Sequence, residues 1–320
     1  MTGEVRLGDT QFAPPPLSEA QVLQFRDCGY LPLARLIDAD QVAVLRGLLL
    51  ALFDGKAGRD EGNQFDMLGL DADGVLPIQP QIVMPSLYAP LLKLPHLPTV
   101  EAIACRLLGP DAEFIFDHSI LKLAGANAAT PWHQDEAYSH DPHFHFEQLS
   151  FWIPLQDVDA DNGCLHYLPG SNLGPLLPHQ AYADEPKLQA IECLTRYFDE
   201  RAAVAVPLAA GDCVVHHGRT LHWASVNRSA GDRLVYVIVF RGPVLARLDP
   251  LQVPWLAARQ TAGIGRSRHW RSHGGYRVLL RRWLGRTLSG SWRQSRIKLR
   301  RLLRRLAVRW QRLRRRRSPG

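Results

Sequence analysis

The sequence predicts a mainly β fold with helices on its N-terminal side and a basic extension on its C-terminal side. Three features carry this prediction: two helix-like apolar runs before about residue 55, six short β-rich runs between residues 113 and 240, and a change of charge after Asp249. Six such runs, separated by turn residues, indicate a β-sandwich or a β-barrel.

The helical part begins near Ser18, which is a favourable N-cap residue for the apolar run that follows it. A turn is expected at Gly29, and Asp38 can cap a second apolar run. We therefore expect two helices before the β region.

The β region starts near Glu113, where the composition shifts toward Val, Ile, Phe, Tyr and Trp, the residues that favour strands. In chain order the six runs read EFIFDHSILKLA, LSFWIPLQDV, CLHYLPGS, AVAVPL, CVVHHG and RLVYVIVF. Gly, Asn, Asp and Pro separate them, as expected of turns between strands.

The composition is that of a globular protein in a reducing compartment. The chain has 320 residues, of which 46% are hydrophobic, enough to bury a large core. Its five cysteines are scattered and form no C-x-x-C pair, which argues against a disulfide framework and against a thiolate zinc site. No apolar stretch approaches the ~20 residues that span a bilayer, and no signal peptide is recognisable. We expect a cytoplasmic protein.

Charge divides the chain into two physically different parts. Residues 1–249 contain all 31 Asp and Glu against 17 Lys and Arg, a net charge of −14, whereas residues 250–320 contain 21 Lys and Arg and no acidic residue, a net charge of +21. We expect an N-terminal lead at residues 1–16, a folded domain at residues 17–249, and a basic, Arg-rich helical extension at residues 250–320.

Leu and Trp recur among the arginines of the extension, mostly three or four residues apart, between Tyr276 and Leu313. This spacing predicts helices with an apolar stripe. Because Trp and Arg in this arrangement suit an anionic membrane surface, peripheral membrane association is the leading interpretation. Two alternatives stay open: an extension that folds back on the acidic domain, and nucleic-acid binding, for which no base-reading motif appears.

A stretch rich in His, Asp and aromatic residues, TPWHQDEAYSHDPHFHF at residues 130–146, is a candidate metal site. On an extended segment, residues i and i+2 project to the same side, so His133 and Asp135 can present an imidazole and a carboxylate to one point. Non-haem Fe(II) oxygenases use two histidines and one carboxylate and leave the remaining coordination positions open. The second histidine must come from elsewhere in the chain.

A later segment, GDCVVHHGRTLHWASVNRS at residues 211–229, offers three histidines, His216, His217 and His222. Arg233 follows at the start of an apolar run, where its guanidinium can bind a carboxylate through two hydrogen bonds.

Taken in order, these segments resemble the phytanoyl-CoA dioxygenase family of Fe(II)- and 2-oxoglutarate-dependent oxygenases. PWHQD resembles the family's first two metal ligands, DNGCLHYLPGSN its Asn-Gly turn and Pro-Gly-Ser stretch, and the segment at residues 211–229 its second-histidine segment. In the family the distal histidine precedes the 2-oxoglutarate arginine by about eleven residues, an interval that His222 and Arg233 match. The resemblance covers about residues 17–242. It departs from the family pattern at Ser225, which lies one position late, and at Asn172, where the family often has histidine.

The resemblance implies a double-stranded β-helix core, the jelly roll of cupin-like proteins, and a dioxygenase domain over residues 17–249. It implies that His133, Asp135 and His222 bind Fe(II), that 2-oxoglutarate chelates the iron while Arg233 binds its distal carboxylate, and that O₂ takes the remaining position. The expected products are succinate, CO₂ and a hydroxylated small-molecule or lipid-like substrate. Halogenation is disfavoured, because related halogenases lack the carboxylate that Asp135 supplies.

Two further residues have two interpretations each. Trp152 is either an ordinary core residue or the aromatic residue that lines the 2-oxoglutarate pocket in the family. Lys122 is either a solvated lysine at a strand edge or a second contact for the 2-oxoglutarate carboxylate.

The other histidines are expected to be structural. A polar loop holds three that are candidates for substrate contact only, His140, His143 and His145, and strand positions account for His166, His216 and His217. The alternative function is a non-catalytic protein that binds membrane or nucleic acid through its extension and uses the jelly roll as a scaffold. Such a protein has no evident need for the full set of metal ligands together with Arg233, so an enzyme is favoured.

Overall fold

The computed structural model describes residues 17–70, 76–93, 97–125, 127–138, 144–247, 253–257 and 261. The chain divides into two units, Met1–Gly265 and Arg266–Gly320, and all described residues belong to the first. The predicted N-terminal lead and the predicted helices between Tyr276 and Leu313 lie outside the described residues, so both stay predictions.

The α-helices of the described part are α1 (Glu19–Cys28), α2 (Ala39–Asp54), α3 (Leu97–Leu108) and the single turn α4 (Pro254–Ala257). The two predicted helices are confirmed, because Ser18 and Asp38 each form a capping box at the start of α1 and α2. Gly29 ends α1 in the left-handed conformation, with φ of 82°, which glycine adopts without strain. The sequence analysis did not predict α3.

The larger sheet is antiparallel and has seven strands. In spatial order they are β1 (Tyr30–Leu33), β12 (Cys213–His217), β7 (Gln148–Pro154), β14 (Arg233–Arg241), β4 (Glu113–Lys122), β3 (Pro80–Val83) and β2 (Gln64–Asp66). The central strands β7 and β14 are buried along nearly their whole length, which explains why their sequences read as continuous apolar runs.

The smaller sheet has four strands, in the order β11 (Val204–Val206), β8 (Leu165–Tyr167), β13 (His222–Ala224) and β5 (Thr130–His133). Two short pairs complete the described strands: β9 (His179–Ala181) with β10 (Ile191–Cys193), and β6 (Phe144–His145) with β15 (Leu245–Ala246). Each of the six β-rich runs contains a strand, so the prediction of a mainly β fold is confirmed.

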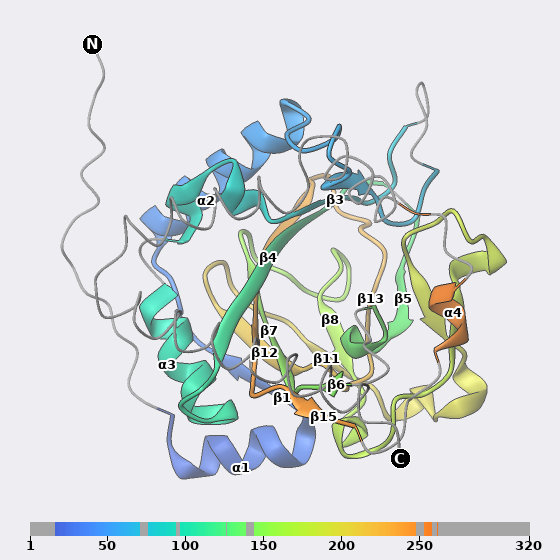
Figure 1. Cartoon of the computed structure of the whole chain (residues 1–320). Helices are drawn as coiled ribbons and strands as arrows, with labels where there is room; N and C mark the ends of the chain where they lie inside the picture. The colour runs from blue at the N-terminus through green and yellow to red at the C-terminus, as the bar shows by residue number, and fades with distance from the viewer. Residues whose placement is uncertain are drawn as a thin grey trace, which may run out of the picture. The chain divides into compact units, whose positions relative to one another are not determined.

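Two apolar cores give the domain its layers. The first lies between the helices and the outer face of the larger sheet, where Val22 and Leu45 of the helices belong to the same cluster as Phe151 of β7. The second lies between the two sheets and includes Val237 of β14 and Tyr167 of β8. Figure 1 shows α1, α2 and α3 on one side of the larger sheet and β5, β8 and β13 on the other. The two facing sheets form the predicted jelly roll, and its interior holds the candidate site.

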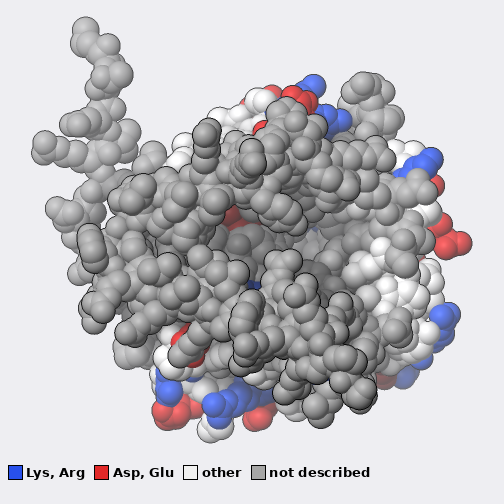
Figure 2. All heavy atoms as spheres, viewed as in Figure 1, with Lys and Arg blue, Asp and Glu red and all other residues white. Residues whose placement is uncertain are grey.

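Figure 2 shows acidic and basic side chains of the described residues beside one another along the lower rim. Among the described helices, none has the length and apolarity needed to cross a bilayer. Cys164 and Cys213 are fully buried, as expected of small apolar core residues.

Candidate metal centre

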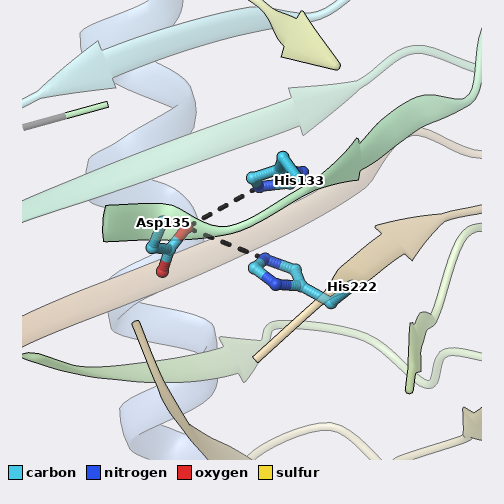
Figure 3. Close-up of side chains that lie close together, drawn as sticks. All are labelled: His133, Asp135 and His222. Atoms are coloured by element: carbon cyan, nitrogen blue, oxygen red, sulfur yellow. Dashed lines mark ion pairs between the residues drawn. The ribbon is translucent and has the colours of Figure 1, made fainter. Parts of the chain in front are cut away.

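His133, Asp135 and His222 meet at one point between the sheets. His133 is the last residue of β5, Asp135 begins the short 3-10 helix η3 (Asp135–Tyr138), and His222 is the first residue of β13 and the cross-strand partner of His133. Asp135 Oδ1 lies 3.6 Å from His133 Nε2 and 3.7 Å from His222 Nε2 (Figure 3). One ligand atom from each residue lies within 4.8 Å of the other two, so the group can hold a metal ion.

Backbone carbonyls orient both imidazoles. The Nδ1 atom of His133 lies 2.8 Å from the carbonyl oxygen of Pro131, and that of His222 lies 2.9 Å from the carbonyl oxygen of Thr220. Because a carbonyl oxygen can only accept, each Nδ1 carries the hydrogen and each Nε2 keeps a lone pair directed toward Asp135. Histidines that bind metals are commonly held in this way.

The protonation states of His222 and Asp135 are those that favour binding of a metal cation. Burial lowers the pKa of His222 well below its ordinary value, and the nearby His133 and His216 lower it further. Burial raises the pKa of Asp135, but its interactions with His133, His216 and His222 outweigh burial and hold this pKa well below its usual range. A neutral imidazole and an ionised carboxylate are the forms that bind metals.

The segment between the first two ligands is fixed by a second layer of contacts. The backbone N–H of Gln134 donates to His179 Nε2 at 3.1 Å, and the Gln134 side-chain oxygen accepts from the N–H of Leu177 at 2.8 Å. The His179 ring packs against Trp255 of α4, and Trp255 Nε1 donates to the carbonyl oxygen of Ala137 in η3 at 3.1 Å. One turn of helix from the predicted extension therefore packs directly behind the metal-binding segment.

Two buried cations lie on adjacent strands of the larger sheet. Arg233 and Lys122 are cross-strand partners on β14 and β4, and they are 2% and 0% exposed. Burial lowers the pKa of Arg233 to about 10, and burial together with the charge of Arg233 lowers the pKa of Lys122 well below its ordinary value. Within the described part of the chain, neither has a carboxylate partner and Arg233 Nε has no hydrogen-bond partner. The strand-edge interpretation of Lys122 is wrong, because β14 covers that edge.

The Asn-Gly turn and Trp152 border this pair. Gly163 has a left-handed φ of 95°, and a Cβ there would lie 3.2 Å from Lys122 Cδ and 3.5 Å from Arg233 Nε, so glycine allows the turn to approach both cations. Lys122 Nζ donates to the carbonyl oxygen of Ser225 at 2.7 Å. The guanidinium carbon of Arg233 lies 5.6 Å from the centre of the Trp152 ring. Trp152 is thus both a core residue and a neighbour of Arg233.

Sequence reasoning assigned no role to His216 and did not consider Ser150, yet both contact Asp135. The available signal was the alternation along β12, which places His216 on the same face as Val214, the face that lines the inner core. His166 packs instead against Trp223. His145 has a buried Nδ1 without a hydrogen bond to any described residue, whereas the other two loop histidines, His140 and His143, lie outside the described residues.

Two histidines and an aspartate that converge inside a jelly roll are the donor set of Fe(II)- and 2-oxoglutarate-dependent oxygenases. The sequence profile of the family described as Phytanoyl-CoA dioxygenase (PhyH) matches residues 25–235. The chain belongs to this family, and the sequence-based resemblance is confirmed. The scaffold-only alternative is not favoured.

Three similar proteins illustrate the range of the class. EvdO2 from Micromonospora carbonacea var. aurantiaca, solved in complex with 2-oxoglutarate, is 32% identical with a TM-score of 0.63, over 75% of this chain and 97% of its own. SnoK, a non-heme alpha ketoglutarate dependent carbocyclase from nogalamycin biosynthesis, is 25% identical with a TM-score of 0.58, over 75% of this chain and 90% of its own. The L-proline trans-4-hydroxylase of Streptomyces griseoviridis is 27% identical over 54% of this chain and 70% of its own.

Proposed function

We propose that this protein hydroxylates a small molecule, with 2-oxoglutarate and O₂ as co-substrates and succinate and CO₂ as by-products. The observation that carries the proposal is the convergence of His133, Asp135 and His222 on one point in a domain that also buries Arg233, whose Nε has no hydrogen-bond partner among the described residues. A buried N–H donor without an acceptor destabilises the folded protein. An Arg233 Nε in this state therefore indicates that a bound ligand supplies the missing acceptor.

In this proposal His133, Asp135 and His222 hold Fe(II), which supplies the position where O₂ is activated. The donor set fits, because both Nε2 atoms are free to coordinate and Asp135 is ionised. His133 and His222 are buried and Asp135 is partly buried, which limits the access of bulk water to the open positions.

Arg233 binds the distal carboxylate of 2-oxoglutarate through its guanidinium, which offers paired donors in the geometry of a carboxylate. Lys122 adds a second positive charge beside it, and Trp152 provides an apolar wall on which the guanidinium rests. Two buried cations without a described counter-ion repel each other, and a dicarboxylate such as 2-oxoglutarate relieves that repulsion.

Hydroxylation is favoured over other oxidative outcomes by the likeness to a proline hydroxylase, although SnoK is a carbocyclase on the same fold. Asp135 occupies the position that a halide needs, which argues against halogenation. A lipid-like substrate and membrane association of the extension rest on the sequence alone.

The proposal is tested by incubating the purified protein with Fe(II), 2-oxoglutarate and a metabolite extract in air, followed by untargeted mass spectrometry. We expect one metabolite to decrease while a product heavier by one oxygen atom forms together with an equal amount of succinate. The His222→Ala variant serves as the inactive control. A product that has lost two hydrogens and gained no oxygen would show ring closure or desaturation instead. The absence of succinate with every extract would favour the scaffold interpretation.

A further inference from the structure

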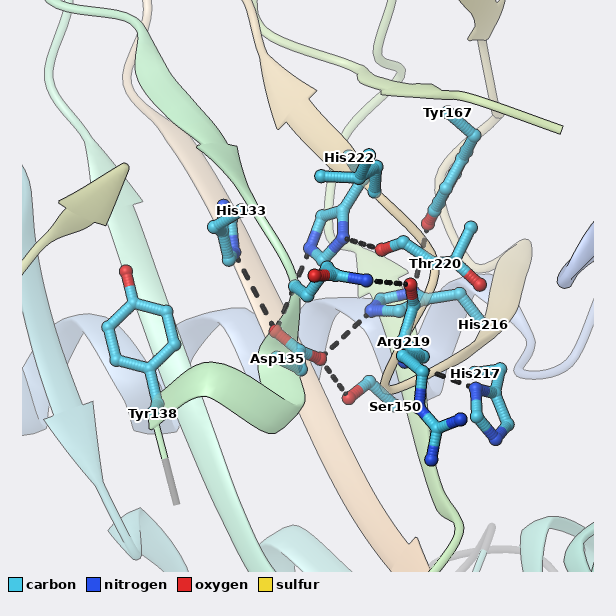
Figure 4. A network of polar contacts seen from close by, with 12 residues as sticks. His133, Asp135, Tyr138, Ser150, Tyr167, His216, His217, Arg219, Thr220 and His222 are labelled. Atoms are coloured by element: carbon cyan, nitrogen blue, oxygen red, sulfur yellow. Dashed lines mark hydrogen bonds and ion pairs between the residues drawn. The ribbon is translucent and has the colours of Figure 1, made fainter. Parts of the chain in front are cut away.

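The two oxygens of the Asp135 carboxylate have different surroundings. Oδ1 faces the Nε2 atoms of His133 and His222, whereas Oδ2 accepts a hydrogen bond from Ser150 Oγ at 2.6 Å and another from His216 Nε2 at 3.1 Å (Figure 4). We propose that His216 and Ser150 are positioning residues that hold Oδ2, so that Asp135 presents only Oδ1 to the metal. This inference rests on the proposed function, in which Asp135 is a metal ligand.

Each of the two ring nitrogens of His216 has a hydrogen-bond partner, Asp135 for Nε2 and Tyr167 for Nδ1. A carboxylate only accepts, so Nε2 of His216 carries the hydrogen that points to Asp135. In the neutral ring, Nδ1 is then the acceptor, and it lies 2.9 Å from the hydroxyl of Tyr167, which donates to it. Tyr167 is fully buried and stacks on Tyr30, with ring centres 4.4 Å apart. The tautomer of His216 therefore follows from its neighbours.

The register of the larger sheet delivers both donors to one place. Ser150 on β7 and His216 on β12 are cross-strand partners, and Tyr30 on β1 is the next residue in the same row. Asp135 comes from the opposite side of the interior, after β5 of the smaller sheet. Because Ser150 and His216 are both buried on paired strands, they form a rigid support for a ligand that lies at the start of a short 3-10 helix.

The number of coordination positions on a metal ion explains why it matters that Asp135 binds through one oxygen only. If His133, Asp135 and His222 hold an octahedral metal ion, two imidazoles and one carboxylate oxygen would use three of its six positions, and a co-substrate that binds through two oxygens would leave one for O₂. A carboxylate that bound through both of its oxygens would take that last position. The hydrogen bonds from His216 and Ser150 to Oδ2 oppose binding of the metal through both carboxylate oxygens. In this way the two residues keep one coordination position open for O₂.

The test compares Ser150→Ala, His216→Phe and the double variant with His216→Gln, whose amide can still donate to Oδ2. Purified metal-free protein is titrated with Co(II), whose visible absorption reports both binding and coordination number. We expect each single donor loss to weaken Co(II) binding and the double variant to weaken it by roughly 10- to 100-fold. We also expect a changed absorption spectrum in the presence of 2-oxoglutarate and an increased KM for O₂. His216→Gln should recover most of the wild-type binding.

Two controls make the outcome decisive. His166→Phe replaces a histidine that packs on Trp223 and does not contact Asp135, and it should bind Co(II) like the wild type. Asp135→Ala tests the premise: if it binds Co(II) with unchanged affinity, Asp135 is not a ligand and the proposed function fails at this residue. If Asp135→Ala loses affinity while the folded Ser150→Ala and double variants keep wild-type affinity and spectrum, the positioning role alone is overturned.

Discussion

Replacing Arg233 by alanine is expected to weaken 2-oxoglutarate binding and to leave iron binding intact. The guanidinium is buried on a central strand, and its Nε has no hydrogen-bond partner among the described residues, so the substitution removes a donor that 2-oxoglutarate completes in the proposed function. Truncating one side of a buried charge pair costs on the order of 2 to 5 kcal/mol. Because Lys122 lies beside Arg233 and still attracts the carboxylate, we expect the lower part of this range.

A cost of roughly 2 to 3.5 kcal/mol corresponds to a dissociation constant about 30- to 300-fold higher, since 1.4 kcal/mol is a factor of ten. The measurement is an anaerobic titration of the Fe(II)-loaded protein with 2-oxoglutarate. Arg241→Ala is the matched control, because Arg241 lies at the other end of β14 and pairs with Glu113. An unchanged dissociation constant in Arg233→Ala, combined with a large loss in Lys122→Ala, would refute the assignment and place the carboxylate on the lysine.

Two further predictions concern the support behind the metal-binding segment and the basic extension. Burial lowers the pKa of His179 to about 4, whereas the unfolded chain titrates near 6.5. Between pH 7 and pH 5 the unfolded state therefore gains a proton that the folded state does not, and the metal-free protein should lose about 2 kcal/mol of unfolding free energy through this residue. Urea unfolding at both pH values checks this: His179→Gln should lack that part of the loss, and an identical pH dependence in both proteins would contradict it. A chain ending at Thr261 keeps Trp255 and should retain its activity. Unlike the full-length chain, it should not co-sediment with anionic vesicles. Equal sedimentation of the truncated and full-length chains would refute a membrane role for residues 262–320. A chain ending at Pro250 also loses the Trp255 hydrogen bond to Ala137 and should be less stable by about 1 kcal/mol.

The candidate metal ligands were predictable because their order and spacing follow a pattern that local sequence can carry. His133 and Asp135 are two residues apart, and the interval to Arg233 selected His222 from three histidines in one segment. The structure brings His133, Asp135 and His222 close together. The runs that form β7 and β14 were predictable for a similar reason, since strands buried on both faces have continuous apolar sequence.

What the sequence did not reveal depends on contacts between distant segments. The burial of Lys122 follows from the pairing of β4 with β14, more than 100 residues later, and the contact of His216 with Asp135 follows from the packing of one sheet on the other. Strand β1 has four residues and is defined by its pairing with β12, so its own sequence carries little signal.

The central claim is that His133, Asp135 and His222 form one Fe(II) site that works with 2-oxoglutarate. An anaerobic titration of the metal-free protein with Fe(II) in the presence of 2-oxoglutarate, followed through the visible absorption band of the ternary complex, tests it directly. We predict one Fe(II) per chain and a clear band for the wild type and for His166→Phe, and neither for His133→Ala or His222→Ala. Wild-type stoichiometry and absorption in both alanine variants would contradict the claim.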